Sequence, residues 1–353
     1  MLYYLSMYFK ATSSFWNVLH YVSFRAMAAL LTSLCFSFLF GEFFIETSKK
    51  FFRSKAREWT PERHKEKDDM PTMGGVFILF VVLATVLLWA PILHYQILIM
   101  IFGLVGFGVI GAWDDWLKIK TRKGISSRMK FLSQCVVAAC CAISMFLNGV
   151  STSISFPFFK SLNPNIGIFF ILWATFIMVG ASNAVNLTDG LDGLAIGSLI
   201  PNFATFSLIC YAAGHYMFAN YLHIPFAGTA ELAVVGAALV GASIGFLWYN
   251  AYPAQIFMGD VGSLALGGAL ALMALMAKQE LLLCIAGGLF VVEALSVMMQ
   301  VYSYRYRGKR IFKMAPIHHH FELLGWQEAK ITIRFGIISL ILCLIALMTL
   351  KIR

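Results

Sequence analysis

Long apolar runs separated by short polar segments make up the chain from residue 26 almost to its end. A helix that crosses a bilayer needs about 20 mostly apolar residues, and at least about 17. Eight runs meet this length clearly: 26–45, 74–93, 97–113, 131–150, 166–185, 194–213, 230–248 and 281–299. Two weaker runs, 264–277 and 335–350, reach it only if flanking residues are included. The pattern predicts an all-α, multi-pass integral membrane protein with about ten transmembrane helices.

The N-terminal segment differs from these runs. Residues 1–21 are rich in aromatic side chains, contain Lys10 as their only Lys or Arg, and lack a clear small-residue cleavage site. Aromatic, amphipathic segments of this kind lie in the membrane interface, whereas a secretory signal would end at a cleavage site. We expect residues 1–25 to form an interfacial segment at the outer face and residues 26–353 to form a single polytopic domain.

The charged residues are unevenly divided between the two membrane faces that ten spans define. Both termini then share one face, and 21 of the 27 Lys and Arg residues fall on the other, in segments 46–73, 114–130, 186–193, 249–263 and 301–334. Lys and Arg are enriched in cytoplasmic loops. The bias predicts that these five segments face the cytoplasm and that both termini lie outside.

Composition agrees with a membrane protein and restricts its function. Hydrophobic residues make up 60% of the chain and charged residues 12%, which excludes a soluble globular protein and a disordered one. The net charge of +10 is compatible with nucleic acid, anionic lipid or a phosphorylated substrate. Only Glu42 and Glu293 are candidates for charges within the membrane, which disfavours a transporter.

Two groups of acidic residues stand at predicted helix ends. Asp114-Asp115 closes the third run, and adjacent carboxylates repel each other unless a cation or proton joins them. Asn186, Asp189 and Asp192 follow at a spacing of three, which would bring them to one face of a helix. A solvated helix end and an Asx-rich turn are the simpler alternatives for these two groups.

Further polar motifs occupy the same predicted face. Gly259-Asp260-Val261-Gly262-Ser263 is typical of a tight turn that presents one carboxylate, and Mg²⁺ prefers carboxylate and phosphate oxygens. Asp260, Asp114 and Asp115 are therefore the candidate ligands. His318, His319 and His320 cannot all face one metal on a regular helix, so phosphate contact or proton transfer suits them better.

The remaining segments on this face allow two interpretations each. Thr72 lies in Pro71-Thr72-Met73-Gly74-Gly75, which suits a helix entry close to phosphate or an ordinary membrane-entry loop. The basic stretch 123–130 could serve only as an orientation signal. Together the loops favour a phosphorylated soluble substrate, a lipid partner in the bilayer and Mg²⁺, whereas nucleic acid would explain the charge alone.

Five motifs carry a resemblance that extends from about residue 49 to the C-terminus. These motifs are Pro71–Gly75, Asp114-Asp115, Asn186–Gly193, Gly259–Ser263 and the Ala315–Glu322 run that contains the three histidines. In them the chain resembles the bacterial phospho-N-acetylmuramoyl-pentapeptide transferases. That family belongs to the superfamily of polyprenyl-phosphate N-acetylhexosamine-1-phosphate transferases. The resemblance implies a membrane transferase, often a homodimer, that acts on UDP-MurNAc-pentapeptide and undecaprenyl phosphate at the cytoplasmic face of the bacterial inner membrane, giving lipid I and UMP.

The same resemblance implies roles for individual residues. Asp260 would be the Mg²⁺ ligand, and Asp114 and Asp115 would handle the lipid phosphate or its proton. The other implied substrate contacts and catalytic groups are Lys67, Thr72, Asn186, Asp189, Asp192, Asn250, Gln300, His318, His319 and His320.

Alternatives to this reaction remain open from the sequence. A sister transferase that uses UDP-GlcNAc would keep the acidic motifs, and a lipid-linked transporter is a more distant alternative. The sequence also does not separate direct attack by undecaprenyl phosphate from a two-step scheme in which an aspartate carries the phosphosugar covalently.

Overall fold

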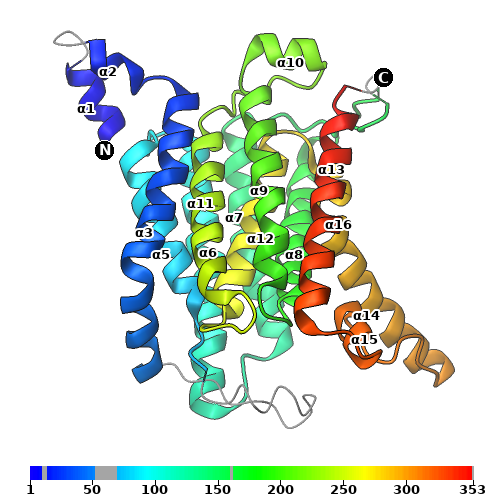
Figure 1. The fold of residues 1–353 in the computed structure, drawn as a ribbon. Coiled ribbons are helices and arrows are strands. Elements are labelled where there is room, and N and C mark those ends of the chain that lie inside the picture. Colours follow the sequence, from blue (N-terminus) through cyan, green and yellow to red (C-terminus); the bar gives the residue numbers. More distant parts are fainter. Residues whose placement is uncertain (10–13, 52–69, 160–161, 352–353) are drawn as a thin grey trace.

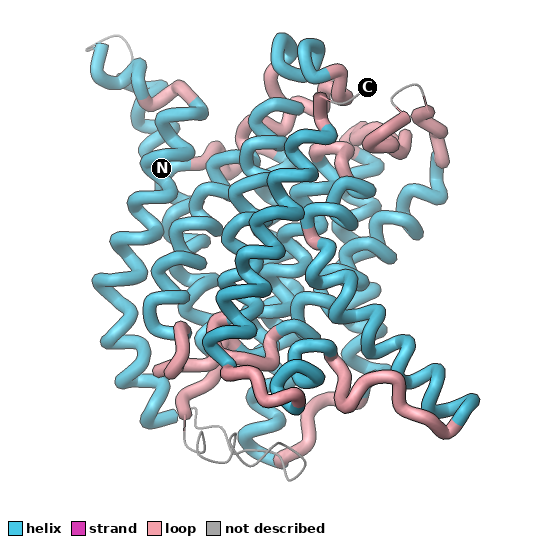
Figure 2. Tube along the Cα trace, turned by 45° about the vertical axis from the view of Figure 1, so that its right-hand side comes forward, coloured by secondary structure: helices cyan, strands magenta, loops and turns pink. Residues whose placement is uncertain are grey.

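The computed structural model describes residues 1–9, 14–51, 70–159 and 162–351, and the regular secondary structure of this part of the chain is helical apart from isolated β-bridge residues, such as the Ser153–Asn165 pair. Figure 1 shows one bundle of roughly parallel helices, and Figure 2 shows that the loops gather at its two ends. Lys67 lies outside the described residues. The all-α prediction is confirmed.

The long helices follow the apolar runs closely. They are α3 (Val22–Phe51), α5 (Gly74–Trp89), α6 (Tyr95–Thr121), α7 (Ser127–Leu147), α8 (Phe170–Thr188), α9 (Leu194–Ala213), α11 (Leu232–Asn250), α12 (Gly259–Met276), α14 (Gly288–Arg307) and α16 (Glu328–Thr349). Short helices complete the structure: α1 (Leu2–Phe9), α2 (Ser14–Val18), α10 (Tyr216–Leu222), α13 (Glu280–Ala286) and α15 (Ile317–Leu323).

The described residues contain eight helices that are long and apolar enough to cross a membrane, and the pair α13–α14 makes a ninth if it is counted as one span. The tenth expected segment forms α5, which is apolar but has only 16 residues. Both weaker runs, now α12 and α16, meet the length requirement. The structure therefore confirms a multi-pass membrane protein, with ten spans only if α5 and the bent pair are included.

The run 281–299 is not the straight span that its composition predicts. It bends by 82° between α13 and α14 at Gly287 and Gly288. Glycine has a low helix propensity, and Gly pairs are frequent points of sharp helix bends. As a result, α14 leans away from the bundle toward its lower end, where α15 packs beside it (Figure 1).

Helix α12 forms the centre of the bundle. It is almost entirely buried and packs against α5, α6, α8 and α9. Small residues allow this, since membrane helices associate by close backbone approach rather than by a hydrophobic driving force. A Cβ atom on Gly75 of α5 would lie 2.0 Å from the backbone nitrogen of Gly262. By contrast only 28% of the apolar stretch is buried in each of α3, α7 and α16, as expected for helices that face lipid.

The two ends of the described chain lie at the same end of the bundle, drawn uppermost in Figure 1. Here Arg25, at the start of α3, makes two 2.7 Å hydrogen bonds to Glu231 and stacks on Tyr3 of α1. This partly buried ion pair joins α3 to the residue before α11, and the stacking on Tyr3 attaches α1 to it. Which membrane face this end occupies, and the interfacial role of residues 1–25, remain predictions.

Candidate active site

Three carboxylates and two lysines meet at the end of the bundle opposite the termini. Lys118 Nζ lies 2.9 Å from Asp114, 3.4 Å from Asp115 and 2.9 Å from Asp260. Lys130 Nζ pairs with Asp260 and lies 3.3 Å from Asp114. Because the carboxylates are largely buried, their charges need these partners. The predicted grouping of the three aspartates is therefore present in the fold.

Local geometry explains why the three aspartates meet. Asp114, Asp115 and Lys118 share one face of α6 through the spacings i+3 and i+4. Asp115 Oδ2 accepts a 3.2 Å hydrogen bond from the backbone N–H of Val261 in the first turn of α12, where the helix dipole favours a negative charge. Gly259 has φ +74°, and a Cβ there would lie 2.4 Å from Asp115 Oδ2. Only glycine satisfies both conditions.

The end of α8 supplies the next part of the site. Asn186 Nδ2 donates to Asp260 Oδ1 at 3.0 Å and contacts Ser263 Oγ at 2.8 Å. Asp189, one residue beyond α8, lies close enough to Asp260 and Asp115 to be affected by their negative charges. Burial, reinforced by the charges of Asp260 and Asp115, raises the pKa of Asp189 to about 8. This side chain is therefore mostly protonated at neutral pH in the ligand-free protein and can donate a hydrogen bond.

The side chains of Asp192 and Asn250 form hydrogen bonds to backbone groups of neighbouring loops. Asp192 Oδ2 accepts the Ala254 N–H at 3.0 Å. Asn250 Oδ1 accepts the Gly193 N–H at 3.1 Å, and its Nδ2 donates to the Ile256 carbonyl at 2.8 Å. Both side chains are buried and join the turn after α8 to the loop before α12. Their predicted contact with substrate remains a prediction.

Thr72 lies beside the aspartates because its segment pairs with the loop before α12. The Phe257 N–H donates to the Pro71 carbonyl, and the Gly74 N–H donates to the Phe257 carbonyl, each at 2.9 Å. Thr72 Oγ1 lies 3.3 Å from the point that a Cβ of Gly259 would occupy, close to Asp115. The structure therefore supports the expected place of Thr72 near the site.

The three histidines point to three different partners. His318 is completely buried and lies 3.1 Å from Glu293 of α14. His319 contacts Glu322 at 3.0 Å, and His320 Nδ1 accepts the Lys313 N–H at 3.1 Å. His318 lies against the turn after α8, where a Cβ on Gly190 would lie 2.3 Å from its Nε2.

Gln300 also acts on a loop. Its Oε1 accepts the Ile311 and Phe312 N–H groups, and its Nε2 donates to the Phe312 carbonyl, each at 3.0 Å. Its amide thus fixes the loop that leads from α14 to the histidines. This contact does not test the expected role in substrate binding.

Lys118 and Lys130 are the members of this cluster that the sequence interpretation missed. From the sequence, the stretch 123–130 that contains Lys130 could serve only as an orientation signal, and Lys118 is not among the candidate site residues. The spacing of Lys118 from Asp114 and Asp115 was a usable signal, because i+3 and i+4 pairs meet on a helix. Lys130 carried no such local signal, since it lies at the start of α7 and reaches the cluster only through the packed fold.

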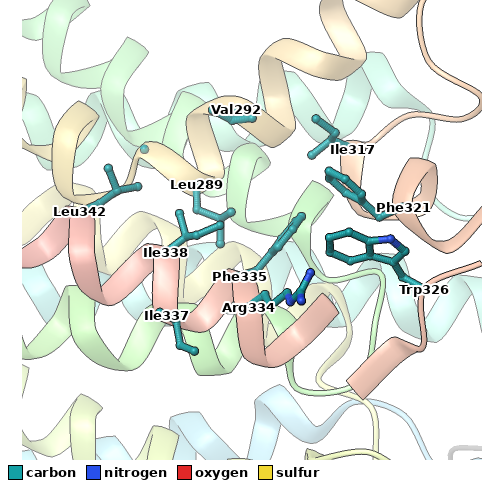
Figure 3. A pocket seen from close by; sticks show the side chains of 11 residues that line it. Leu289, Val292, Ile317, Phe321, Trp326, Arg334, Phe335, Ile337, Ile338 and Leu342 are labelled. Atoms are coloured by element: carbon teal, nitrogen blue, oxygen red, sulfur yellow. The ribbon is translucent and has the colours of Figure 1, made fainter. Parts of the chain in front are cut away.

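An apolar cavity of about 500 Å³ lies between α14, α15 and α16. Figure 3 shows the rings of Phe321, Trp326 and Phe335 on one side, and Arg334 at the edge, where it stacks on Trp326 at 4.6 Å. Leu289, Val292 and Ile338 line the opposite part. The cavity is thus next to the helix that carries the histidines.

Comparison with known proteins defines first the class and then the family. Residues 97–278, which hold the three aspartates and Asn186, match the family described as Glycosyl transferase family 4. The fold and site are those of a membrane-embedded glycosyl transferase.

Individual relatives narrow the class to one family. Two phospho-N-acetylmuramoyl-pentapeptide-transferases, from Geobacter sp. (strain M21) and Citrifermentans bemidjiense, are each 51% identical to the chain over 358 residues. That of Solidesulfovibrio magneticus is 49% identical. These matches cover 100% of each protein. The chain belongs to the phospho-N-acetylmuramoyl-pentapeptide-transferase family.

Proposed function

We propose that the protein transfers phospho-MurNAc-pentapeptide from UDP-MurNAc-pentapeptide to undecaprenyl phosphate, giving lipid I and UMP, at the cytoplasmic face of the bacterial inner membrane. The observation that carries this proposal is the cluster of three aspartates and two lysines at one end of a membrane-spanning bundle. The charge bias described above supports the cytoplasmic side, because each of the five segments on that side carries a residue of the site or of the adjoining histidines.

The reaction asks the protein mainly to position two anionic reactants and to offset their charge. An oxygen of the lipid phosphate attacks the phosphorus that bears the sugar, and the bond to the uridine-bearing phosphate breaks, releasing UMP. Asp114 or Asp115 removes the remaining proton of the lipid phosphate. Lys118 and Lys130, already held by the aspartates, offset charge on the diphosphate.

Mg²⁺ fits the chemistry of the donor set. Within the described residues no group of three His, Cys, Asp or Glu side chains is arranged to hold a metal ion, but Lys118 contacts all three aspartates with one cationic group. Asp260, with Asp114 and Asp115 beside it, would hold the ion together with substrate phosphates, as is usual for Mg²⁺. When bound, the ion neutralises charge on the diphosphate and the departing UMP.

The lipid acceptor requires apolar surface close to the aspartates. The cavity between α14 and α16 is apolar apart from Arg334 and borders α15, whose His318 lies against the turn after α8. We assign the prenyl chain to this side of the bundle. The proposed homodimer rests on the family resemblance alone.

The first prediction tests the reaction itself. Purified protein with Mg²⁺ and undecaprenyl phosphate should release UMP from UDP-MurNAc-pentapeptide, and chelation of Mg²⁺ should abolish the release. The measurement is UMP formation with each of two donors, UDP-MurNAc-pentapeptide and UDP-GlcNAc. Release from UDP-GlcNAc alone would assign the protein to the sister reaction, and no release from either would contradict the enzyme function and favour a transporter.

The two-step alternative is tested in the same preparation. Donor and Mg²⁺ without lipid acceptor should give no stable phosphosugar adduct on the protein by mass spectrometry. Asp114 Oδ1 and Asp115 Oδ2 each accept a backbone N–H, at 2.7 and 3.2 Å, which leaves one oxygen of each free of the backbone. An adduct on either residue would replace direct attack with the covalent scheme.

Lys130→Met is expected to lower UMP release by about tenfold or more, because it removes the cation between Asp114 and Asp260 from a site that works by charge stabilisation. Lys123→Met is the matched control, since Lys123 is exposed in the same basic stretch. Initial rates of both variants give the comparison. Equal rates for the two variants would contradict a catalytic role of Lys130 and leave membrane orientation as its role.

A further inference from the structure

Glu293 is a completely buried carboxylate that the proposed reaction does not use. It lies within α14, in a chain whose other charges are concentrated at the loops. Its Oε2 accepts the Ile317 N–H at 2.9 Å and lies 3.1 Å from His318 Nδ1. A buried carboxylate inside a membrane protein is costly to maintain, which makes a functional role the default interpretation.

The opposite edge of the His318 ring faces the active site. Nε2 is directed at Gly190, where a Cβ would lie only 2.3 Å away. Gly190 follows Asp189, and the same helix end carries Asn186, which is hydrogen-bonded to Asp260. The imidazole is thus held between a carboxylate on one side and the turn after α8 on the other.

Carboxylate–imidazole pairs of this kind fix which ring nitrogen carries the proton. A carboxylate at Nδ1 accepts its proton, so Nε2 keeps a lone pair. We propose that Glu293 is a positioning residue for the transferase reaction: it holds His318 as the Nδ1–H tautomer, with Nε2 presented as an acceptor to the turn at Asp189 and Gly190. This inference rests on the proposed function.

A purely mechanical role for Glu293 explains less of the geometry. Tethering of α15 requires only an acceptor for the Ile317 N–H, and a neutral amide would provide one without a buried charge. Among the described residues, Glu293 Oε1 has no hydrogen-bond partner, and neither ring nitrogen of His318 has one with good geometry, so the carboxylate acts on Nδ1 mainly through its charge at 3.1 Å. The carboxylate is therefore not optimised as a tether, whereas its negative charge is what distinguishes the two nitrogens of His318.

The local charges also set how His318 responds to pH. Burial lowers the pKa of His318, while the nearby charge of Glu293 opposes that shift. The other titratable groups that bear on the ring are His319 and Glu322 of its own helix, and Asp189 precedes the glycine that the ring contacts. Removal of the Glu293 charge should lower the pKa of His318 further.

Glu293→Gln is the deciding variant, because it keeps the shape and removes the charge. The Oε2 position faces both the Ile317 N–H and His318 Nδ1. With the amide oxygen there, both contacts stay and only the charge is lost; with the amide nitrogen there, the Ile317 hydrogen bond is lost and the ring proton moves to Nε2. We expect kcat for UMP release to fall by at least about tenfold with KM nearly unchanged, and the acidic limb of the kcat–pH profile to move to lower pH. Glu293→Asp should recover part of the rate, and Glu46→Gln, an exposed carboxylate on α3, should behave as wild type.

The outcomes separate this inference from the proposed function. Wild-type rates and an unchanged pH profile in Glu293→Gln overturn the positioning role while leaving the reaction intact. If the wild-type protein releases no UMP, the proposed function fails, and the pair is then judged by thermal unfolding of Glu293→Gln, His318→Asn and the double variant. Non-additive shifts in the midpoint support the Glu293–His318 interaction, and additive shifts overturn it.

Discussion

Asp260→Asn is expected to reduce UMP release by at least about 100-fold. The substitution removes a carboxylate that contacts Lys118, Lys130 and Asn186 together, and it removes the proposed Mg²⁺ ligand. The amide oxygen can still accept the hydrogen bond from Asn186, so the packing of α8 against α12 should be retained. Initial rates at saturating donor and lipid, measured across a range of Mg²⁺ concentrations, give the result.

The control for Asp260→Asn separates chemistry from folding. Thermal unfolding in detergent should change little, since the isosteric amide leaves the central helix intact. Glu46→Gln removes one negative charge at an exposed position of α3 and should keep full activity. A rate for Asp260→Asn within a few-fold of wild type, at any Mg²⁺ concentration, would contradict the assignment of Asp260 as the metal ligand.

The helical architecture could be predicted because each spanning helix corresponds to one continuous apolar run in the sequence. An apolar run of sufficient length has few alternatives in a bilayer, where every backbone polar group must be satisfied internally. The bend between α13 and α14 was not predicted, since Gly287 and Gly288 permit a bend without requiring one. Its direction depends on how α13 and α14 pack against α16, which the sequence does not state.

The site was predictable only where polar residues occur in unusual local groups. Asp114, Asp115, Asn186 and Asp260 were found in this way, and the fold brings all four into direct or shared contact. Lys130 was missed because nothing in the sequence distinguishes it from the other basic residues of its stretch. Only the packing of α7 against α6 brings it to the aspartates.

Residues that bond to distant loops lie beyond what a local pattern can reveal. Asn250 and Gln300 are expected substrate contacts, yet both use their amides to hold backbone groups. The sequence shows that the three histidines diverge on a helix, because successive residues point in different directions, but it does not show which of them faces the site. His318 reaches Glu293 and Gly190 while His320 bonds to the loop behind it.

Gly111→Ala is the second variant with a large expected effect. Gly111 lies in α6, one turn before the paired aspartates, and a Cβ there would fall 2.2 Å from the carbonyl oxygen of Asp260 and 2.5 Å from the backbone nitrogen of Val261. These neighbours are backbone atoms at the start of α12, so no side chain can rotate to make room. The two helices must separate, which moves Asp114 and Asp115 away from Asp260.

We expect Gly111→Ala to lower UMP release by at least about 100-fold, because displacements near 1 Å can cost that much in catalysis. Overpacking also costs about 1–3 kcal/mol of stability, so the thermal midpoint should fall. Gly180→Ala in α8 is the matched control, since a Cβ there would meet nothing within 4 Å; it should leave both quantities close to wild type. Wild-type activity in Gly111→Ala would mean that the close contact of α6 with α12 does not set the spacing of the three carboxylates.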